Sequence, residues 1–328
     1  MDSIREATLE NEEKNISVYG MLCRNTKGRQ RPEEECGIRT AYQRDRDRIL
    51  HCDSFRRLMH KTQVFLSPDG DHYRTRLTHT LEVCQIARTI AVGLRLNEDL
   101  TEAIALGHDL GHTPFGHAGE RTLDRIMPDG FRHYEQSLRT VDVIEKLNLT
   151  YEVRDGIVCH TRGKEADTLE GRVVKLADRI AYINHDIDDA IRGNVITREN
   201  IPAYARGVLG ETKSERINSL VLSAINNSMG DIALGESEEA AFDELYGFMF
   251  ERVYTNPVCK SEEKKADVMI ESLFNFFLKN PQELTEDYMA IAFSEGLERA
   301  VCDYVAGMTD TYAVRTFETY FIPKGWKN

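Results

Sequence analysis

Cysteine is scarce in this sequence, and its seven residues are widely scattered without a Cys-x-x-Cys pair. An odd number of isolated cysteines excludes a disulfide-scaffold protein and favours free thiols in a reducing compartment. No apolar run approaches the ~20 residues that a membrane-spanning helix needs, and no secretory signal core follows Met1. These absences predict a cytoplasmic protein with no membrane partner.

Positive charge is also in deficit. The 328 residues include 42 Lys and Arg against 55 Asp and Glu, which gives a net charge of −13 at pH 7. This balance argues against a protein that binds nucleic-acid backbones through its overall charge. An anionic substrate would have to meet a local cluster of basic side chains instead. Hydrophobic residues make up 41% of the chain, which is normal for a globular protein with a sizeable core.

Alternating apolar and polar residues, the pattern of β-strands, do not recur over any useful length. Apolar residues instead recur with a 3.6-residue period, so the fold class is predicted to be all-α. The predicted helices span 37–63, 77–93, 97–110, 137–147, 149–160, 171–191, 214–228, 238–254, 263–279 and 285–304. Residues 67–72 are predicted to form a turn. We divide the chain into an irregular N-terminal arm (1–37), a core (38–200) and a helical C-terminal region packed on that core (201–328).

The stretch from Ala105 to Glu120 concentrates the polar chemistry of the chain. Within it, His108 and Asp109 are adjacent in an apolar run. Neighbouring side chains on a helix diverge by roughly 100°, so an ordinary amphipathic helix would not bury both. An unpaired buried acid would cost several kcal/mol. A metal ion relieves this cost, because imidazole and carboxylate are both good metal ligands.

Two further residues complete a ligand set. His79 lies at the start of a predicted helix, and Asp178 is the single acid in an apolar helical run. Alone, either residue would more commonly be an ordinary hydrogen-bonded side chain. Together with His108 and Asp109 they predict one divalent metal ion per chain, with coordination positions left open for water or substrate. These ligands suit Mn, Mg, Fe, Co, Ni or Zn alike.

Acid–base groups follow the His-Asp pair. His112 and His117 flank a Thr-Pro-Phe-Gly bend, and Glu120 follows His117 by three residues. A carboxylate at this spacing would orient an imidazole and raise its basicity, which indicates acid–base catalysis. Glu120 is alternatively a helix-start acid that interacts with the helix dipole. His133, beyond a Pro-Asp-Gly turn, would be an outer group of the same site.

Basic groups lie close to the predicted ligands. Arg76 precedes His79 by three residues and shares its helix face, while Arg179 directly follows Asp178. Tyr182 is one helical turn further along. Arginines and a tyrosine hydroxyl beside a metal suit a phosphate substrate. In an acidic protein this local concentration predicts a hydrolase that acts on a phosphomonoester, a phosphodiester or a nucleotide.

Seven strings of the sequence form a characteristic set, of which His108 to Glu120 is the most specific. The other six strings are residues 55–58, 61–65, 74–79, 135–137, 177–182 and 303–312. The set resembles the HD-domain metal-dependent phosphohydrolases, and in particular their deoxyguanosine-triphosphate triphosphohydrolase branch. The resemblance extends from residue 38 to residue 320, which is most of the chain.

The resemblance implies an HD-domain helical bundle with additional C-terminal helices. It also implies a reaction in which a dNTP, such as dGTP, is hydrolysed at the α-phosphate to a deoxynucleoside and inorganic triphosphate. In this reaction His117 would be the general acid toward the 5′ oxygen. Glu120 would orient His117, and His112 would lie at the triphosphate.

The resemblance further assigns the substrate contacts. Phosphate oxygens would be held by Arg76, Arg179 and Tyr182. Gln63 and Asp186 occupy positions similar to those that touch the deoxyribose. Family members commonly form hexamers or other assemblies, several are activated by a second dNTP, and some bind single-stranded nucleic acid. The implied partners are therefore deoxynucleoside triphosphates as substrate and effector, further copies of the chain, and single strands.

Two other functions compete with this interpretation. One is an HD-type phosphodiesterase or phosphomonoesterase with two metals, for which His133 and His160 would supply the extra ligands. The other is a non-catalytic regulator that binds nucleotides or nucleic acid. The basic run over residues 39–57 favours the regulator, although such a run is equally a solvated helix face paired with acids. The string at 108–120 favours triphosphate release, and the sequence does not select the base.

Overall fold

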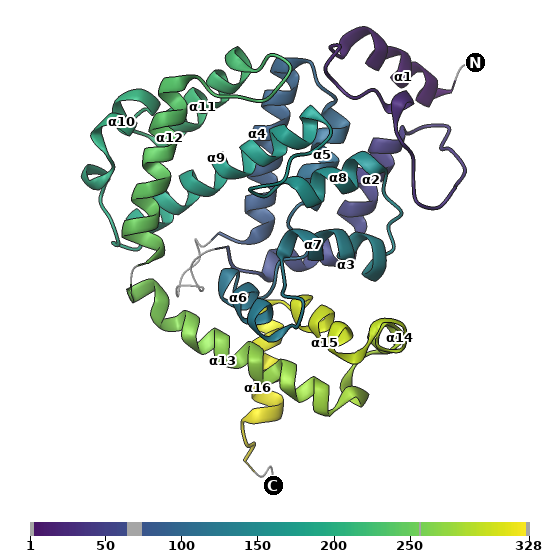
Figure 1. Ribbon diagram of the computed structural model, residues 1–328, viewed down its shortest axis with the longest axis vertical. Coiled ribbons are helices and arrows are strands. Elements are labelled where there is room, and N and C mark those ends of the chain that lie inside the picture. Colours follow the sequence, from purple (N-terminus) through teal and green to yellow (C-terminus); the bar gives the residue numbers. More distant parts are fainter. Residues whose placement is uncertain (1–2, 64–73, 256, 326–328) are drawn as a thin grey trace.

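The computed structural model describes residues 3–63, 74–255 and 257–325, and Figure 1 shows it as an assembly of helices. Sixteen α-helices and no strand occur in these ranges, so the predicted all-α class is confirmed. No helix in the described part of the chain is long and apolar enough to cross a membrane. The six described cysteines are all free thiols, and four of them are buried.

The helices of the main body precede residue 250. They are α1 (Ile4–Asn15), α2 (Ala41–His51), α3 (Asp53–Arg57), α4 (Arg76–Leu94), α5 (Glu98–Gly107), α6 (His117–Ile126), α7 (His133–Arg139), α8 (Tyr151–Cys159), α9 (Leu169–Arg192), α10 (Ala203–Leu209), α11 (Lys213–Asn227) and α12 (Glu236–Met249). The C-terminal helices are α13 (Pro257–Lys279), α14 (Glu286–Glu295), α15 (Leu297–Ala306) and α16 (Asp310–Phe321).

Three helices, α4, α5 and α9, pack against one another at the centre of the main body. Helix α5 is enclosed by α2, α4, α8 and α9, and its side chains from Leu100 to Leu106 are buried except Glu102. Its small residues Ala103 and Ala105 let the neighbouring helices approach closely. Full burial of a Leu or Ile side chain stabilises the fold by roughly 1.5–3 kcal/mol. The packing around α5 therefore fixes the position of its C-terminal end.

A second apolar cluster joins α6 to the C-terminal helices. Leu123, Met127 and Phe131 pack with buried residues of α13 and α15, among them Phe277 and Val301. In Figure 1, α13 runs alongside α6, and α14 to α16 gather at the same end of the molecule. Helices α10 to α12 instead share the main core cluster with α9. The domain boundaries at 37 and 200 stay predictions.

Three predicted segments differ from the structure. The arm at 1–37 was predicted to be irregular but contains helix α1, which is capped by Ser3. This helix buries only Leu9, so its sequence lacks a clear 3.6-residue apolar period. The helix predicted over 37–63 is interrupted at Cys52, whose sulfur caps α3. The helix predicted over 285–304 breaks at Gly296, whose φ of 100° is left-handed. The turn predicted at 67–72 lies outside the described residues.

Candidate active site

The four predicted metal ligands converge from three helices. His79 lies in the first turn of α4, Asp178 lies in the middle of α9, and His108 and Asp109 directly follow α5. His79 Nε2 is 3.0 Å from Asp178 Oδ1, and His108 Nε2 is 3.5 Å from Asp109 Oδ1. Ligands bonded to one ion at about 2.1 Å lie roughly 3–4 Å apart. The spacing of the His79, His108 and Asp109 ligand atoms therefore fits a cation, and Asp178 adjoins this group through its contact with His79.

His108 is oriented for metal binding. Its Nδ1 lies 2.7 Å from the carbonyl oxygen of Ala105, to which it donates, so its Nε2 carries the lone pair. That Nε2 is fully buried and lacks a hydrogen-bond partner among the described residues. An unsatisfied buried polar atom costs about 1–3 kcal/mol. A cation held by His79, His108 and Asp109, whose ligand atoms lie within 4.8 Å of one another, removes that cost.

Both carboxylates of the cluster stay ionised. Burial tends to raise the pKa of Asp109, but the facing His108 and His112 hold it well below its ordinary value. Burial likewise opposes ionisation of Asp178, yet the hydrogen bond with His79 brings the pKa of Asp178 to about 2. Asp109 also accepts a hydrogen bond of 2.8 Å from Arg76 Nη1. Two negative charges are therefore available to a cation.

The segment 111–117, which we name the catalytic strip, reverses the chain between α5 and α6. Phe115 and Gly116 have left-handed φ values of 61° and 55°, and Thr113 Oγ1 donates to the Gly116 carbonyl. Helix α6 then begins at His117, whose Nε2 is 3.2 Å from Tyr182 Oη. The His117 side chain is 45% exposed, so it remains accessible to a ligand.

Glu120 serves two histidines. Its Oε1 accepts hydrogen bonds from the backbone nitrogen and Nδ1 of His133 at 2.9 and 2.8 Å, while its Oε2 is 3.5 Å from His117 Nδ1. Burial opposes ionisation, but these histidines hold the pKa of Glu120 well below its ordinary value. His133 in turn stacks on His112 with ring centroids 4.1 Å apart. The predicted pairing of Glu120 with His117 is thus looser than its contact with His133.

A cavity of about 250 Å³ opens beside these groups. Of the predicted substrate contacts, Gln63, Arg76, Arg179 and Tyr182 line the cavity. Asp186 is not among the described lining residues, because it is buried one turn beyond Tyr182, where its carboxylate accepts a hydrogen bond from Tyr254. Burial raises the pKa of Asp186 well above its ordinary value. The role of each residue toward a substrate stays a prediction.

The structure adds cavity residues that the sequence did not indicate. Arg162, Lys175 and Tyr246 line the cavity, and the Arg162 guanidinium lies 4.0 Å from the centre of the Tyr246 ring. Lys175 precedes Asp178 by three residues on α9, so helical spacing alone could have found it. Arg162 and Tyr246 come from a loop and from α12, and no local pattern connects either with the His-Asp pair.

We expect the metal-free protein to lose stability as the pH falls from about 6.5 to 4. Burial holds the pKa of His160 and of His185 at about 4 each, below the 6.5 of an exposed histidine. In this window the unfolded chain binds protons that the folded chain does not, so acidification favours unfolding. Each histidine contributes on the order of 3 kcal/mol to the pH dependence. Thermal unfolding midpoints measured against pH test this expectation.

The control for this experiment is a histidine on the surface. His160→Gln should flatten the pH dependence of the unfolding midpoint, whereas the exposed His51, replaced in the same way, should leave the slope unchanged. If the unfolding midpoint depends on pH with the same slope in wild type and His160→Gln, the folded protein does not hold His160 in its neutral form.

Two family profiles match the chain. An HD domain covers residues 76–183, and a phosphohydrolase-associated domain covers residues 232–319. The first match spans α4 to α9 and contains all four predicted metal ligands. The second begins before α12 and ends within α16, so it includes the helices that pack on α6.

Curated relatives match over nearly the whole chain. A deoxyguanosinetriphosphate triphosphohydrolase-like protein of Caldanaerobacter subterraneus subsp. tengcongensis is 54% identical, with 98% of this chain and 97% of the relative covered. A protein of the same name from Clostridium tetani is 46% identical, with the same two shares covered.

Solved structures of lower identity share the fold. A hypothetical protein from Aquifex aeolicus aligns over 84% of this chain and 71% of its own, with a TM-score of 0.50 and 21% identity. A phosphohydrolase from Bacteroides thetaiotaomicron aligns over 83% of this chain and 69% of its own, with a TM-score of 0.51 and 15% identity.

Proposed function

The chain belongs to the deoxyguanosinetriphosphate triphosphohydrolase-like family of HD-domain phosphohydrolases, so it is a hydrolase of phosphate compounds, and we propose that it acts on a dNTP. The products would be a deoxynucleoside and inorganic triphosphate, with dGTP as a first candidate substrate. One observation carries the proposal: the His-Asp cluster opens onto a cavity that is also lined, besides the Arg76 paired with Asp109, by three cationic side chains in a protein of net charge −13. These cations are Arg162, Lys175 and Arg179.

A divalent metal would be held by His79, His108, Asp109 and Asp178. Such an ion, when bound, polarises a phosphoryl oxygen and lowers the pKa of a bound water. His117 lines the cavity, and its two ring nitrogens lie beside Tyr182 and Glu120, respectively. It is thereby placed to give a proton to the 5′ oxygen that leaves as the nucleoside.

Gln63 supplies a recognition group inside the cavity. Its side-chain oxygen Oε1 is buried without a hydrogen-bond partner in the described ranges, while its backbone oxygen accepts from Arg76 Nη2 at 3.3 Å. The free oxygen would accept a hydrogen bond from a sugar hydroxyl. The Nε of Arg76 is also buried without such a partner and would donate to a phosphate oxygen.

Product analysis is the experiment that tests the proposal. The metal-loaded protein is incubated with each dNTP singly and then in pairs, and nucleosides are separated from nucleotides by chromatography. Deoxynucleoside without mono- or diphosphate supports triphosphate release, and turnover only in pairs supports an effector site. Nucleoside monophosphate as the product, or no turnover with any mixture, contradicts the proposal. Light scattering of the same sample tests the proposed homo-oligomer.

A two-metal phosphoesterase is the second candidate, and a specific arrangement favours it. Asp109, His112 and His133 form another group whose ligand atoms lie within 4.8 Å of one another. Two ions per chain, together with hydrolysis of a phosphodiester, would favour this alternative. One ion per chain would favour the triphosphohydrolase.

We expect Arg162→Ala and Lys175→Met each to raise the KM for a dNTP by about 10-fold or more, because a charge-assisted hydrogen bond contributes roughly 1.5–3 kcal/mol. The kcat should change much less, since the described polar contacts of His117 are with Tyr182 and Glu120 and include neither of these side chains. Steady-state kinetics with the preferred dNTP provide the measurement. Lys265→Met removes an exposed lysine of α13 and serves as the control. An unchanged KM in both cavity variants would place the triphosphate elsewhere.

A further inference from the structure

The string at 303–312 has no part in the chemistry described so far, yet it contacts the catalytic strip. Asp310, the first residue of α16, accepts a hydrogen bond of 2.9 Å from the backbone nitrogen of Phe115 through Oδ1. Its Oδ2 accepts from the backbone nitrogen of Thr62 at 3.0 Å and from Thr62 Oγ1 at 2.7 Å. One carboxylate of the C-terminal region thus joins two separate segments of the cavity wall.

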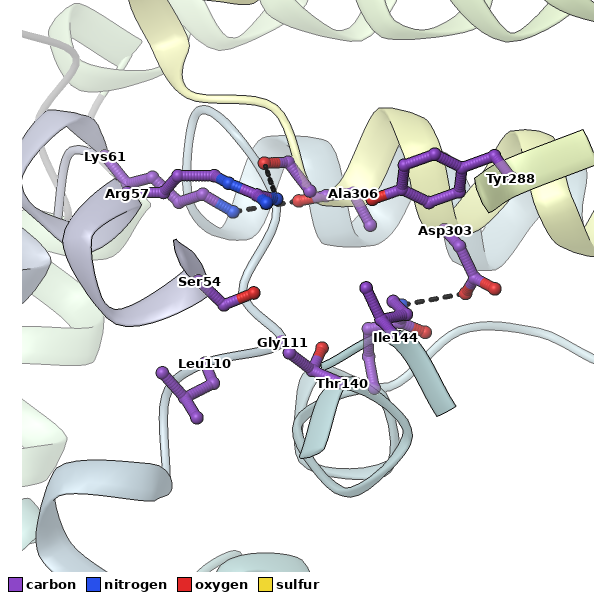
Figure 2. Close-up of a pocket in the computed structure, with 12 residues that line it drawn as sticks. Ser54, Arg57, Lys61, Leu110, Gly111, Thr140, Ile144, Tyr288, Asp303 and Ala306 are labelled. Carbon is purple, nitrogen blue, oxygen red and sulfur yellow. Dashed lines mark hydrogen bonds between the residues drawn. The ribbon is translucent and has the colours of Figure 1, made fainter. Parts of the chain in front are cut away.

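Lys61 makes a parallel connection. Its side chain is buried, and its Nζ donates to the backbone oxygen of Ala306 at 2.9 Å and to that of His112. Figure 2 shows Lys61 and Arg57 reaching from the main body toward Ala306. Arg57 Nη1 donates to the Gly307 oxygen at 3.3 Å. The end of α15 is therefore tied to the catalytic strip by a second, independent contact.

The two segments that Asp310 joins lead directly to predicted reaction groups. Phe115 is two residues before His117 and has a φ of 61°, a conformation that residues other than glycine rarely adopt. Thr62 precedes Gln63, whose carbonyl accepts from Arg76. A strip held in an uncommon conformation depends on contacts outside itself, and the acceptor for the Phe115 N–H comes from α16.

We propose that Asp310 is a positioning residue, through which the C-terminal region holds His117 and Gln63 in their working arrangement. The kinetic part of this proposal rests on the proposed function. A role limited to docking the C-terminal helices is assigned instead to Asp303. It accepts hydrogen bonds from Gln136, Arg139 and Arg299, which are not among the described residues that line the cavity. Asp310 differs from Asp303 because its donors belong to the strip and to the Gln63 segment.

Asp310→Asn is the decisive variant. An amide has one acceptor oxygen where the carboxylate has two, so one of the two backbone N–H groups loses its acceptor. We expect kcat for the preferred dNTP to fall roughly 10- to 100-fold, the size of effect that a misplacement of about 1 Å produces. Metal content should stay close to wild type, and the unfolding midpoint should fall only slightly, as expected for the loss of one hydrogen-bond acceptor. Amide hydrogen exchange should quicken in peptides that cover 111–117, but not in those that cover α4, α5 and α9.

Two further variants separate positioning from docking. Thr62→Val keeps both backbone contacts with Asp310 and should lower kcat less than threefold. Glu295→Gln removes the 2.6 Å ion pair of Glu295 with Arg139, which also fastens the C-terminal helices to α7, and should leave kcat unchanged. Any one of three results for Asp310→Asn would overturn the proposal. These are a kcat within twofold of wild type, unchanged amide exchange in the strip, and faster amide exchange throughout the chain. If wild type hydrolyses no dNTP, the proposed function fails and the exchange measurement alone decides.

Discussion

Asp109→Asn should reduce triphosphate release by more than about 1,000-fold, because a metal contributes several kcal/mol to the transition state and each 1.36 kcal/mol is tenfold in rate. The amide keeps the shape of Asp109 but removes one of the two negative charges in the ligand cluster. Metal content, measured by mass spectrometry of the purified protein, should fall from near one ion per chain in parallel with activity.

The same substitution has a second cost that must be separated from metal loss. Asp109 is the partner of the buried Arg76, and breaking a buried ion pair destabilises a protein by roughly 3–5 kcal/mol. Asp178→Asn avoids this cost, because Asp178 is partly exposed and its ion-pair partners in the described part of the chain are His79 and His108, with no arginine. Asp167→Asn, at an exposed pair with Lys27, is the control. Full metal content with near wild-type turnover in both ligand variants would disprove the metal centre.

The second large effect is expected at His117. His117→Gln should lower kcat by roughly 10²- to 10⁴-fold, the usual contribution of a general acid. The metal should remain bound, because His117 lies outside the ligand cluster. Rapid-quench measurement of nucleoside release determines kcat, and the metal content of the same sample confirms that the centre is intact.

The leaving group provides the control for His117. A substrate that releases an aryl oxide needs little protonation, so His117→Gln should lose far less activity toward it than toward a dNTP. Tyr182→Phe, which removes the hydroxyl 3.2 Å from His117, should have an intermediate effect. An equal loss with both leaving groups would mean that His117 binds or positions the substrate and does not transfer the proton.

The convergence of His79, His108 and Asp109 could be predicted from the sequence because its most unusual feature is local. His108 and Asp109 are adjacent in an apolar run, and the end of α5 at Gly107 lets both side chains turn toward the same point. His79 and Asp178 each stand out against apolar helical neighbours. A polar residue that is buried in a site therefore stands out in the sequence against its apolar neighbours.

The contacts among the polar side chains were less readable. Arg76 was predicted to bind phosphate because it shares a helix face with His79. In the structure its Nη1 donates a hydrogen bond to Asp109. The proximity of Tyr246 to the cavity depends on how α12 packs against α9, and the burial of Asp186 depends on Tyr254. Such pairings are set by tertiary packing between segments tens of residues apart, and a helical period carries no information about them.

Helix α9 determines more than the position of one ligand. Lys175, Asp178, Arg179 and Tyr182 occupy a stretch of eight residues, which spans about 10 Å along a rigid helix. The predicted metal ligand of α9 and the predicted phosphate contacts are therefore held at fixed spacing by one helix, whereas Arg162 and Tyr246, which also line the cavity, belong to other elements. Substitutions at Arg162 or Tyr246, by engineering or by descent, would consequently alter how the proposed substrate is bound while the spacing of the four groups on α9 stays constant.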